Sequence, residues 1–171
     1  MHAEVQAMGL LSRRELDVTV DHCRFGLLDM AAAATVSPPH PAAGAGWVAA
    51  GPCVIYIETT DDVLRARLSL EVWDGPAAIN AAHWPDYEHV RLDLPSGRFG
   101  VDEIAAGWEP DVFALPSAGR WQVRIARREG AVWLPVTAPT GYAPTEDPSE
   151  KDVGAYYLLQ FWPAVAGPDS V

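Results

Sequence analysis

Strict alternation of apolar and polar residues recurs along the chain, and it limits the fold more than any other feature. Four segments carry it, at residues 16–20, 65–73, 88–94 and 120–128. Neighbouring side chains of a β-strand point to opposite faces, so alternation places one row in a core and the other in solvent. In the fourth segment the apolar row holds Trp121, Val123 and Ile125. Strands buried on one face only are typical of antiparallel sheets.

Two further segments, "CVIYIE" (53–58) and "AYYLLQFW" (155–162), are almost continuously apolar. Their β-branched and aromatic residues favour strands that lie deeper in the core. With the alternating segments and the turn residues between them, they predict an all-β fold, an antiparallel β-sandwich of about eight to ten strands. One short helix has room near 27–35, "LLDMAAAAT", because alanine has the highest helix propensity.

The length of 171 residues favours a single domain over 1–171. We expect residues 1–12 to form a frayed N-terminal extension and residues 137–154 to form a long loop before the last strand. The chain has no apolar run of membrane-spanning length and no signal-peptide pattern, so we expect a cytoplasmic protein that does not enter a membrane. Cys23 and Cys53 lie in apolar segments and are interpreted as small buried residues; whether they ever bond is left open.

The segment "LPSGRF" (94–99) has an echo in "LPSAGRW" (115–121). In both, proline presets the backbone at a turn, glycine supplies a positive φ, and the next residues begin a strand. The flanking sequences do not match, so we interpret the echo as one kind of turn used twice. Phe99 and Trp121 are then expected to point inward, and Arg98 and Arg120 outward.

Motifs of catalysis are missing from the sequence. It contains no Gly-x-Ser-x-Gly elbow and no His-Glu-x-x-His, and no glycine-rich phosphate loop precedes a helix. We therefore predict no catalytic residues, no cofactor and no resident metal. The best metal candidate is the segment 83–89, with His83, Asp86, Glu88 and His89, but Pro85 prevents a helix from aligning them. A metal-dependent hydrolase using His83, Asp86 and His89 stays as one alternative.

Tryptophan offers a second alternative. The chain has seven tryptophans, and Trp84 and Trp108 fall in turn-like segments where their rings would be exposed. Exposed aromatic rings are frequent at binding hot spots. A β-sandwich that binds a sugar or another small ligand through these two rings is therefore kept as a hypothesis.

Charge points to a different partner. The formal net charge is -11, which argues against nucleic acid and favours a basic protein. Residues 99–119 contain four acidic residues and no lysine or arginine, whereas 120–128 contains four arginines. We therefore expect a basic partner to contact the first segment, helped by the acidic loop that follows the arginine-bearing strand. The predicted partner-binding residues are Asp102, Glu103, Trp108, Glu109, Asp111, Glu146 and Asp147.

The order of segments from "RELDVTVDHCRFGLLD" through "GWVAAGPCVIYIET" and "RLSLEVWD" to "AYYLLQFWPA" resembles the competence protein J family over residues 14–164. The described member of that family is a small acidic β-sandwich protein that inhibits the DNA-entry nuclease and forms a complex with it. The resemblance implies a non-enzymatic binding protein that inhibits a basic partner such as a nuclease. The chain departs from the family in the connector 30–46, an insertion in 74–86 and the long segment 129–154. The resemblance does not identify individual contact residues, and it leaves the partner's identity and the oligomeric state open.

Overall fold

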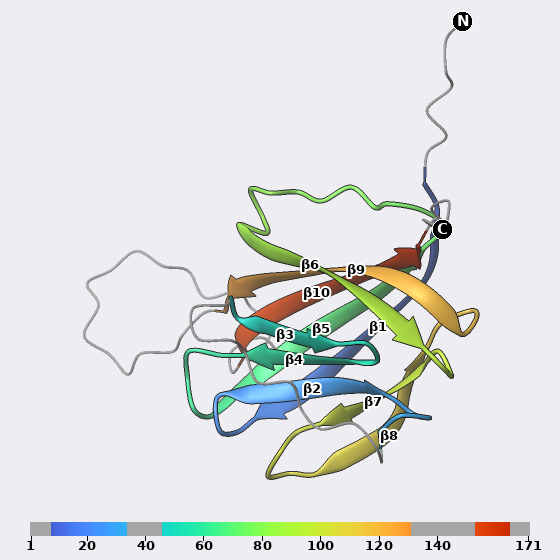
Figure 1. Cartoon of the computed structure of the whole chain (residues 1–171). Helices are drawn as coiled ribbons and strands as arrows, with labels where there is room; N and C mark the ends of the chain where they lie inside the picture. Colours follow the sequence, from blue (N-terminus) through green and yellow to red (C-terminus); the bar gives the residue numbers. More distant parts are fainter. Residues whose placement is uncertain (1–7, 34–45, 131–152, 165–171) are drawn as a thin grey trace, which may run out of the picture.

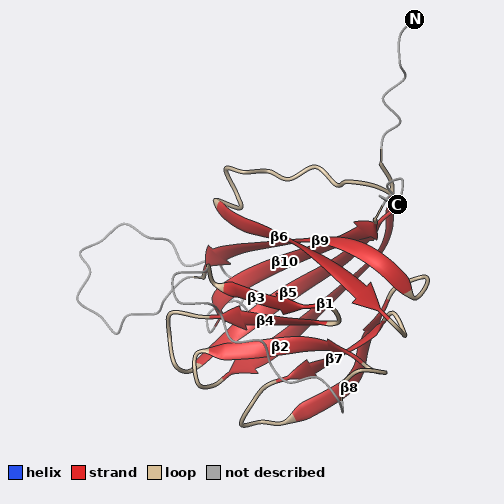
Figure 2. Cartoon of the chain, in the orientation of Figure 1, coloured by secondary structure: helices blue, strands red, loops and turns tan. Residues whose placement is uncertain are grey.

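The computed structural model describes residues 8–33, 46–130 and 153–164, which form ten β-strands (Figures 1 and 2). The strands are β1 (Leu10–Val20), β2 (Arg24–Asp29), β3 (Val48–Gly51), β4 (Val54–Glu58), β5 (Leu64–Trp73), β6 (Asp86–Leu94), β7 (Arg98–Asp102), β8 (Trp108–Ala114), β9 (Gly119–Glu129) and β10 (Val153–Pro163). Within these residues there is no helix long and apolar enough to cross a membrane.

The strands form two sheets of five. One sheet has the order β1-β5-β10-β9-β6 and the other the order β3-β4-β2-β7-β8. Neighbouring strands are antiparallel except β5 and β10, which run parallel in the middle of the first sheet. Figure 1 shows the two sheets as layers facing each other. The predicted β-sandwich is confirmed, at the upper end of the expected strand number.

The inward rows of both sheets make one core, and the alternating segments supply much of it. Trp121, Val123 and Ile125 are buried in β9, as the alternation predicts. They share a cluster with Phe25 and Phe99 of the opposite sheet. Burying one large apolar side chain stabilises a fold by roughly 1.5–3 kcal/mol, so rows of this kind hold the two layers together.

The strand β10 is buried on both faces, which explains its nearly continuous apolar sequence. Its inward side chains join the core, and its outward side chains Leu158, Gln160 and Trp162 are also buried. The segment between β5 and β6 lies across this outer face: Ala77 is buried, and its carbonyl oxygen accepts a hydrogen bond from Arg124 Nη1 at 2.7 Å.

The short helix allowed near 27–35 is wrong for the residues that the structure describes. Leu27 and Leu28 belong to β2 and pair with β4 and β7, and residues 30–33 form a turn. Burial of the two leucines between neighbouring strands outweighs the helix propensity of the alanines. Residues 34 and 35 lie outside the described part of the chain.

Two expected boundaries also shift. Residues 10–12 of the extension expected over 1–12 belong to β1, which pairs with β5 from Leu10, and residues 1–7 lie outside the described part of the chain. Of the loop expected over 137–154, residues 153 and 154 belong to β10, and residues 137–152 lie outside the described part. The interpretation of both cysteines as buried is wrong for Cys23, which is exposed in the turn between β1 and β2, whereas Cys53 is half-buried.

The two echoing turns lie against each other. Leu115 donates its N–H to the carbonyl oxygen of Gly97 at 2.8 Å. Gly97 has a φ of 68°, and a Cβ atom there would lie 2.6 Å from the carbonyl oxygen of Ser117. Positive φ and lack of space both require glycine. The predicted orientation is confirmed as well, because Phe99 and Trp121 are buried.

Candidate functional site

One end of the sandwich collects acidic side chains from segments that are far apart in the sequence. The strand register pairs the start of β2 with the ends of β4 and β7, and the end of β1 with the start of β5. Strand β9 ends and β10 begins at the same side (Figure 1, left). We call this surface the acidic end, and its carboxylates belong to Asp21, Glu58, Asp61, Asp62, Asp102, Glu103 and Glu129.

The hairpin of β7 and β8 is fastened to this end through two of the predicted residues. The carboxylate of Asp102 accepts hydrogen bonds from the Tyr56 hydroxyl at 2.6 Å and from the Ile104 N–H at 3.0 Å. Glu103 Oε1 accepts the N–H of Thr19 at 2.8 Å, which joins the hairpin to β1 in the other sheet. Burial and the hydrogen bond to Asp102 raise the pKa of Tyr56, so the phenol stays protonated and keeps donating. Both carboxylates therefore serve the fold as well as the surface.

The other acidic residues of the predicted set differ in their surroundings. Glu109 is exposed in β8. Asp111 pairs with Arg98, whose Nε donates to its Oδ1 at 2.9 Å, and this hydrogen bond lowers the pKa of Asp111. Asp111 is therefore neutralised within the fold and contributes little to the acidic surface. Glu146 and Asp147 lie outside the described residues.

Trp108 is partly a packing residue. Its side chain keeps 40 % of its surface exposed, yet its ring lies on β7, where a Cβ atom on Gly100 would be 2.2 Å from Trp108 Cη2. The close approach of ring and backbone explains the glycine. Asp102 is the cross-strand partner of Trp108.

The loop between β4 and β5 supplies carboxylates that the predicted set does not contain. Asp62 Oδ1 lies 3.8 Å from Cys23 Sγ, which donates a weak hydrogen bond to it. Desolvation, and then the charges of Asp62, Glu58 and Asp61, raise the pKa of the Cys23 thiol. A protonated thiol is a poor nucleophile, so the turn carries negative charge rather than a reactive cysteine. The sequence "ETTDD" between two strands marks this loop, but only the fold brings it to the β1–β2 turn, where the Cys23 N–H donates to the carbonyl oxygen of Asp62 at 3.2 Å.

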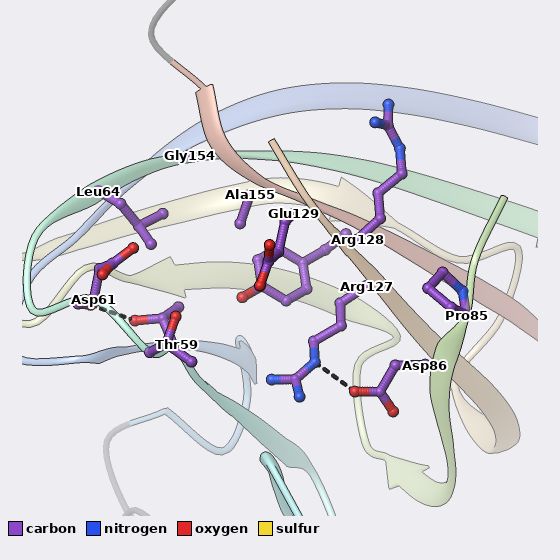
Figure 3. Close-up of a pocket in the computed structure, with 12 residues that line it drawn as sticks. Thr59, Asp61, Leu64, Pro85, Asp86, Arg127, Arg128, Glu129, Gly154 and Ala155 are labelled. Atoms are coloured by element: carbon purple, nitrogen blue, oxygen red, sulfur yellow. Dashed lines mark hydrogen bonds and ion pairs between the residues drawn. The ribbon is translucent and has the colours of Figure 1, made fainter. Parts of the chain in front are cut away.

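A cavity of about 580 Å³ opens at the acidic end, between the ends of the two sheets. Its lining residues come from the β4–β5 loop, the start of β6, the end of β9 and the start of β10 (Figure 3). Arg127 Nε donates to Asp86 Oδ2 at 2.7 Å, and its guanidinium lies 4.5 Å from the ring centroid of Trp47. Two carboxylates, Asp61 and Glu129, also line the cavity.

The arginines of β9 are not the exposed basic face that the sequence predicts. Arg124 is partly buried between the rings of Tyr87 and Trp162, and its Nη1 hydrogen-bonds Gln160 Oε1 at 3.1 Å. Gln160 in turn donates to the buried carboxylate of Glu71 at 3.0 Å. Arg127 pairs with Asp86, and Arg128 stacks on aromatic rings. Only Arg120 is largely exposed, with 69 % of its side chain accessible.

The residues of the metal alternative have other partners. Asp86 binds Arg127, and His89 Nε2 accepts a hydrogen bond from Arg124 Nε at 3.3 Å. Burial, and then the charge of Arg124, lower the pKa of His89. His83 packs edge-on against Trp84, with ring centroids 5.4 Å apart. Across the described residues, no three His, Cys, Asp or Glu side chains gather to hold a metal ion.

The two tryptophans of the sugar-binding alternative do not form a shared binding surface. Trp84 precedes β6 of one sheet, and Trp108 begins β8 of the other. The Arg128 guanidinium lies 5.6 Å from the Trp84 ring centroid, and Gly100 lies under the Trp108 ring. Each tryptophan is thus engaged separately within the fold.

Comparison with known proteins shows a shared fold. No family model matches the sequence, and no curated protein matches it. The crystal structure of ComJ, inhibitor of the DNA degrading activity of NucA, from Bacillus subtilis, is similar with a TM-score of 0.58 and 12% identity, over 92% of this chain and 98% of ComJ. The structure of crocagin biosynthetic gene J is similar with a TM-score of 0.51 and 15% identity, over 92% of this chain and 99% of the other. The resemblance inferred from the order of segments is confirmed at the level of the fold.

Proposed function

We propose that this chain is a non-enzymatic binding protein that inhibits a basic protein partner, with a DNA-degrading nuclease as the partner of first choice. The observation that carries the proposal is the acidic end. Turns from both sheets place carboxylates together on a fold shared with ComJ, a nuclease inhibitor. The chain as a whole carries a net charge of -11, which adds a long-range attraction to any basic partner.

The physical basis is competition for a phosphate-binding surface. A nuclease holds DNA with lysine and arginine side chains that neutralise phosphates. A rigid surface that presents carboxylates at one end of a sandwich attracts the same side chains and blocks access of DNA. Exposed charges attract at long range and raise the association rate, and the exposed part of Trp108 supplies apolar contact inside the acidic surface.

We assign to the partner the carboxylates of Asp61 and Glu129 at the acidic end and that of Glu109, which lies next to this end on β8. Glu109 extends the surface along β8, and none of the three forms a side-chain hydrogen bond or ion pair with the described residues. Asp102 and Glu103 support the surface by fixing the hairpin that carries it.

The direct test is inhibition of DNA degradation. The purified chain is titrated against NucA, and against basic nucleases of the cell that produces the chain, with double-stranded DNA as substrate. We expect stoichiometric inhibition of at least one nuclease and co-elution of the two proteins in gel filtration. Absence of both inhibition and complex formation with every nuclease tested would contradict the proposal. An excess of bovine serum albumin, which is also acidic, controls for non-specific charge effects.

A further inference from the structure

The net charge of the cavity at the acidic end depends on which of its charged lining residues already have partners within the fold. Of its two arginines, Arg127 forms an ion pair within the fold, whereas Arg128 only stacks on aromatic rings and its buried Nε has no hydrogen-bond partner among the described residues. Arg127 pairs with Asp86 and lies over Trp47, and the Arg128 guanidinium lies 3.9 Å from the Tyr156 ring centroid. Figure 3 shows Arg127 directed to Asp86 and Arg128 turned away from the other lining residues.

The carboxylates that remain have no cationic partner in the described part of the chain. Asp61 comes from the β4–β5 loop and Glu129 from the last position of β9 (Figure 3). Thr59 Oγ1 donates its proton to the carbonyl oxygen of Asp61 at 2.8 Å, which leaves the lone pairs of the hydroxyl oxygen for a donor from outside. With Arg127 paired to Asp86, the charge of Arg128 offsets one of the two remaining carboxylates, so the cavity offers hydrogen-bond acceptors and a net negative charge.

A buried hydroxyl supplies the second, independent observation. Tyr157 is only 2% exposed and lines the cavity, yet its hydroxyl forms no hydrogen bond with any described residue. The hydroxyl oxygen is not fully enclosed by the fold, so it faces the space of the cavity and is open to a hydrogen bond from a ligand. Burial raises the pKa of Tyr157 to about 12, so the hydroxyl is neutral at physiological pH and can accept a hydrogen bond.

The remaining walls are apolar and suit a long methylene stem. Leu64, Pro85 and Ala155 line the cavity beside the Tyr157 ring. A lysine or arginine side chain combines such a stem with a charged head. Arginine fits better than lysine, because its planar guanidinium binds carboxylates through paired hydrogen bonds and stacks on aromatic rings.

We propose that this cavity receives an arginine side chain of the basic partner, with Asp61 and Glu129 binding the guanidinium and the Tyr157 hydroxyl accepting a further hydrogen bond. The inference rests on the proposed function and deepens it, because it turns a diffuse charge attraction into a site with one anchoring residue. An anchor in a pocket inside a charged rim is the arrangement that concentrates binding energy in protein interfaces.

The first experiment uses a small probe and no partner protein. Nα-acetyl-arginine methylamide is titrated into the isotope-labelled chain and followed by NMR, with the lysine analogue and inorganic phosphate as parallel probes. We expect the arginine compound to shift the signals of Thr59, Glu129 and Tyr157, and to bind more tightly than the lysine compound. Preferential binding of phosphate at these residues would overturn the proposal, because it would make the cavity an anion site.

Variants then test the assigned groups. Asp61→Asn with Glu129→Gln should weaken binding of the arginine compound about tenfold or more, as expected from loss of charge-assisted hydrogen bonds. Tyr157→Phe keeps the buried ring, removes only an unpartnered hydroxyl, and should weaken binding several-fold with the fold intact. The matched control, Glu15→Gln with Asp93→Asn, removes the same charge from exposed carboxylates of β1 and β6 and should leave binding unchanged. Equal binding by both double variants would overturn the assignment.

Nuclease inhibition separates this inference from the proposed function. If the unaltered chain inhibits no nuclease but binds the arginine compound in the cavity, the proposed function fails and the site stands. If the chain inhibits a nuclease, and Asp61→Asn with Glu129→Gln leaves the inhibition constant unchanged, the function stands and the arginine anchor is refuted.

Discussion

Asp29 shows how one side chain ties three segments of the chain together. It is fully buried at the end of β2, and its carboxylate accepts hydrogen bonds from the N–H groups of Ala31, Ser96 and Gly97 and from the Ser96 hydroxyl. Asp29 thus shapes both the turn that directly follows it and the first of the two echoing turns, which is 67 residues away in the sequence. A buried carboxylate is stable when hydrogen-bond donors surround it in this way.

Replacing Asp29 with asparagine should therefore destabilise the protein strongly. The new amide N–H group would face backbone N–H donors, and at least one buried hydrogen bond would be lost. We expect the free energy of unfolding to fall by about 3 kcal/mol. Urea denaturation followed by tryptophan fluorescence measures it.

Asp74→Asn is the matched control for this change. The Asp74 carboxylate accepts one exposed hydrogen bond, from the Gly9 N–H at 2.7 Å, and its replacement should cost less than about 1 kcal/mol. Similar losses in the two variants would show that Asp29 has no special role in fastening the turns.

At the scale of the elements, strands were predictable and their partners were not. The alternation of residues 120–128 predicts β9 and its buried row correctly, because one face of a sheet dictates the sequence locally. Residues 27–29 pair with β4 and β7 although the alanines that follow favour helix, and this pairing is set by distant residues. The acidic end has the same origin: Asp61 and Glu129 are brought together by strand register, which no local pattern encodes.

The pairing of β1 with β5 predicts a dependence of stability on pH. Asp17 of β1 is bonded to Arg67 at 2.9 Å and also pairs with Arg65, and the hydrogen bond from Arg67 in particular lowers the pKa of Asp17. A carboxyl whose pKa is lower in the folded state stabilises the fold above its ordinary pKa of 3.8, and loses that contribution as pH falls through the folded value.

Asp17→Asn should accordingly reduce stability at pH 7 by about 1 kcal/mol or less, because the pair is partly exposed. The difference between the variant and the unaltered protein should shrink steadily as pH falls below about 4. Urea denaturation across pH, with Asp93→Asn as the exposed control, measures this. A difference that stays constant down to acid pH would show that the ion pairs of Asp17 contribute nothing.

At the scale of the whole molecule, the packed core lies between the two sheets and the acidic surface lies at one end of the sandwich. The two sheets share one core, and the echoing turns close the end opposite the acidic one. The arginines of β9 contact aromatic rings and carboxylates within the first sheet. They therefore neutralise less of the negative charge at the acidic end than four free arginines would. The acidic charge is therefore concentrated at one end of the sandwich, where Asp102 and Glu103 also fasten the β7–β8 hairpin.

The measurement that tests the central claim most directly is the salt dependence of nuclease inhibition, compared between the unaltered chain and Asp61→Asn/Glu109→Gln/Glu129→Gln. These three residues have no side-chain hydrogen bond or ion pair to the described part of the chain, so the fold should survive their replacement. For the unaltered chain we predict that inhibition weakens steeply between about 50 and 300 mM salt, because exposed charges are screened. For the variant we predict slower association, weaker inhibition at low salt and a flatter salt dependence. Inhibition by the variant that equals that of the unaltered chain at every salt concentration would contradict the account and place the binding surface elsewhere on the molecule.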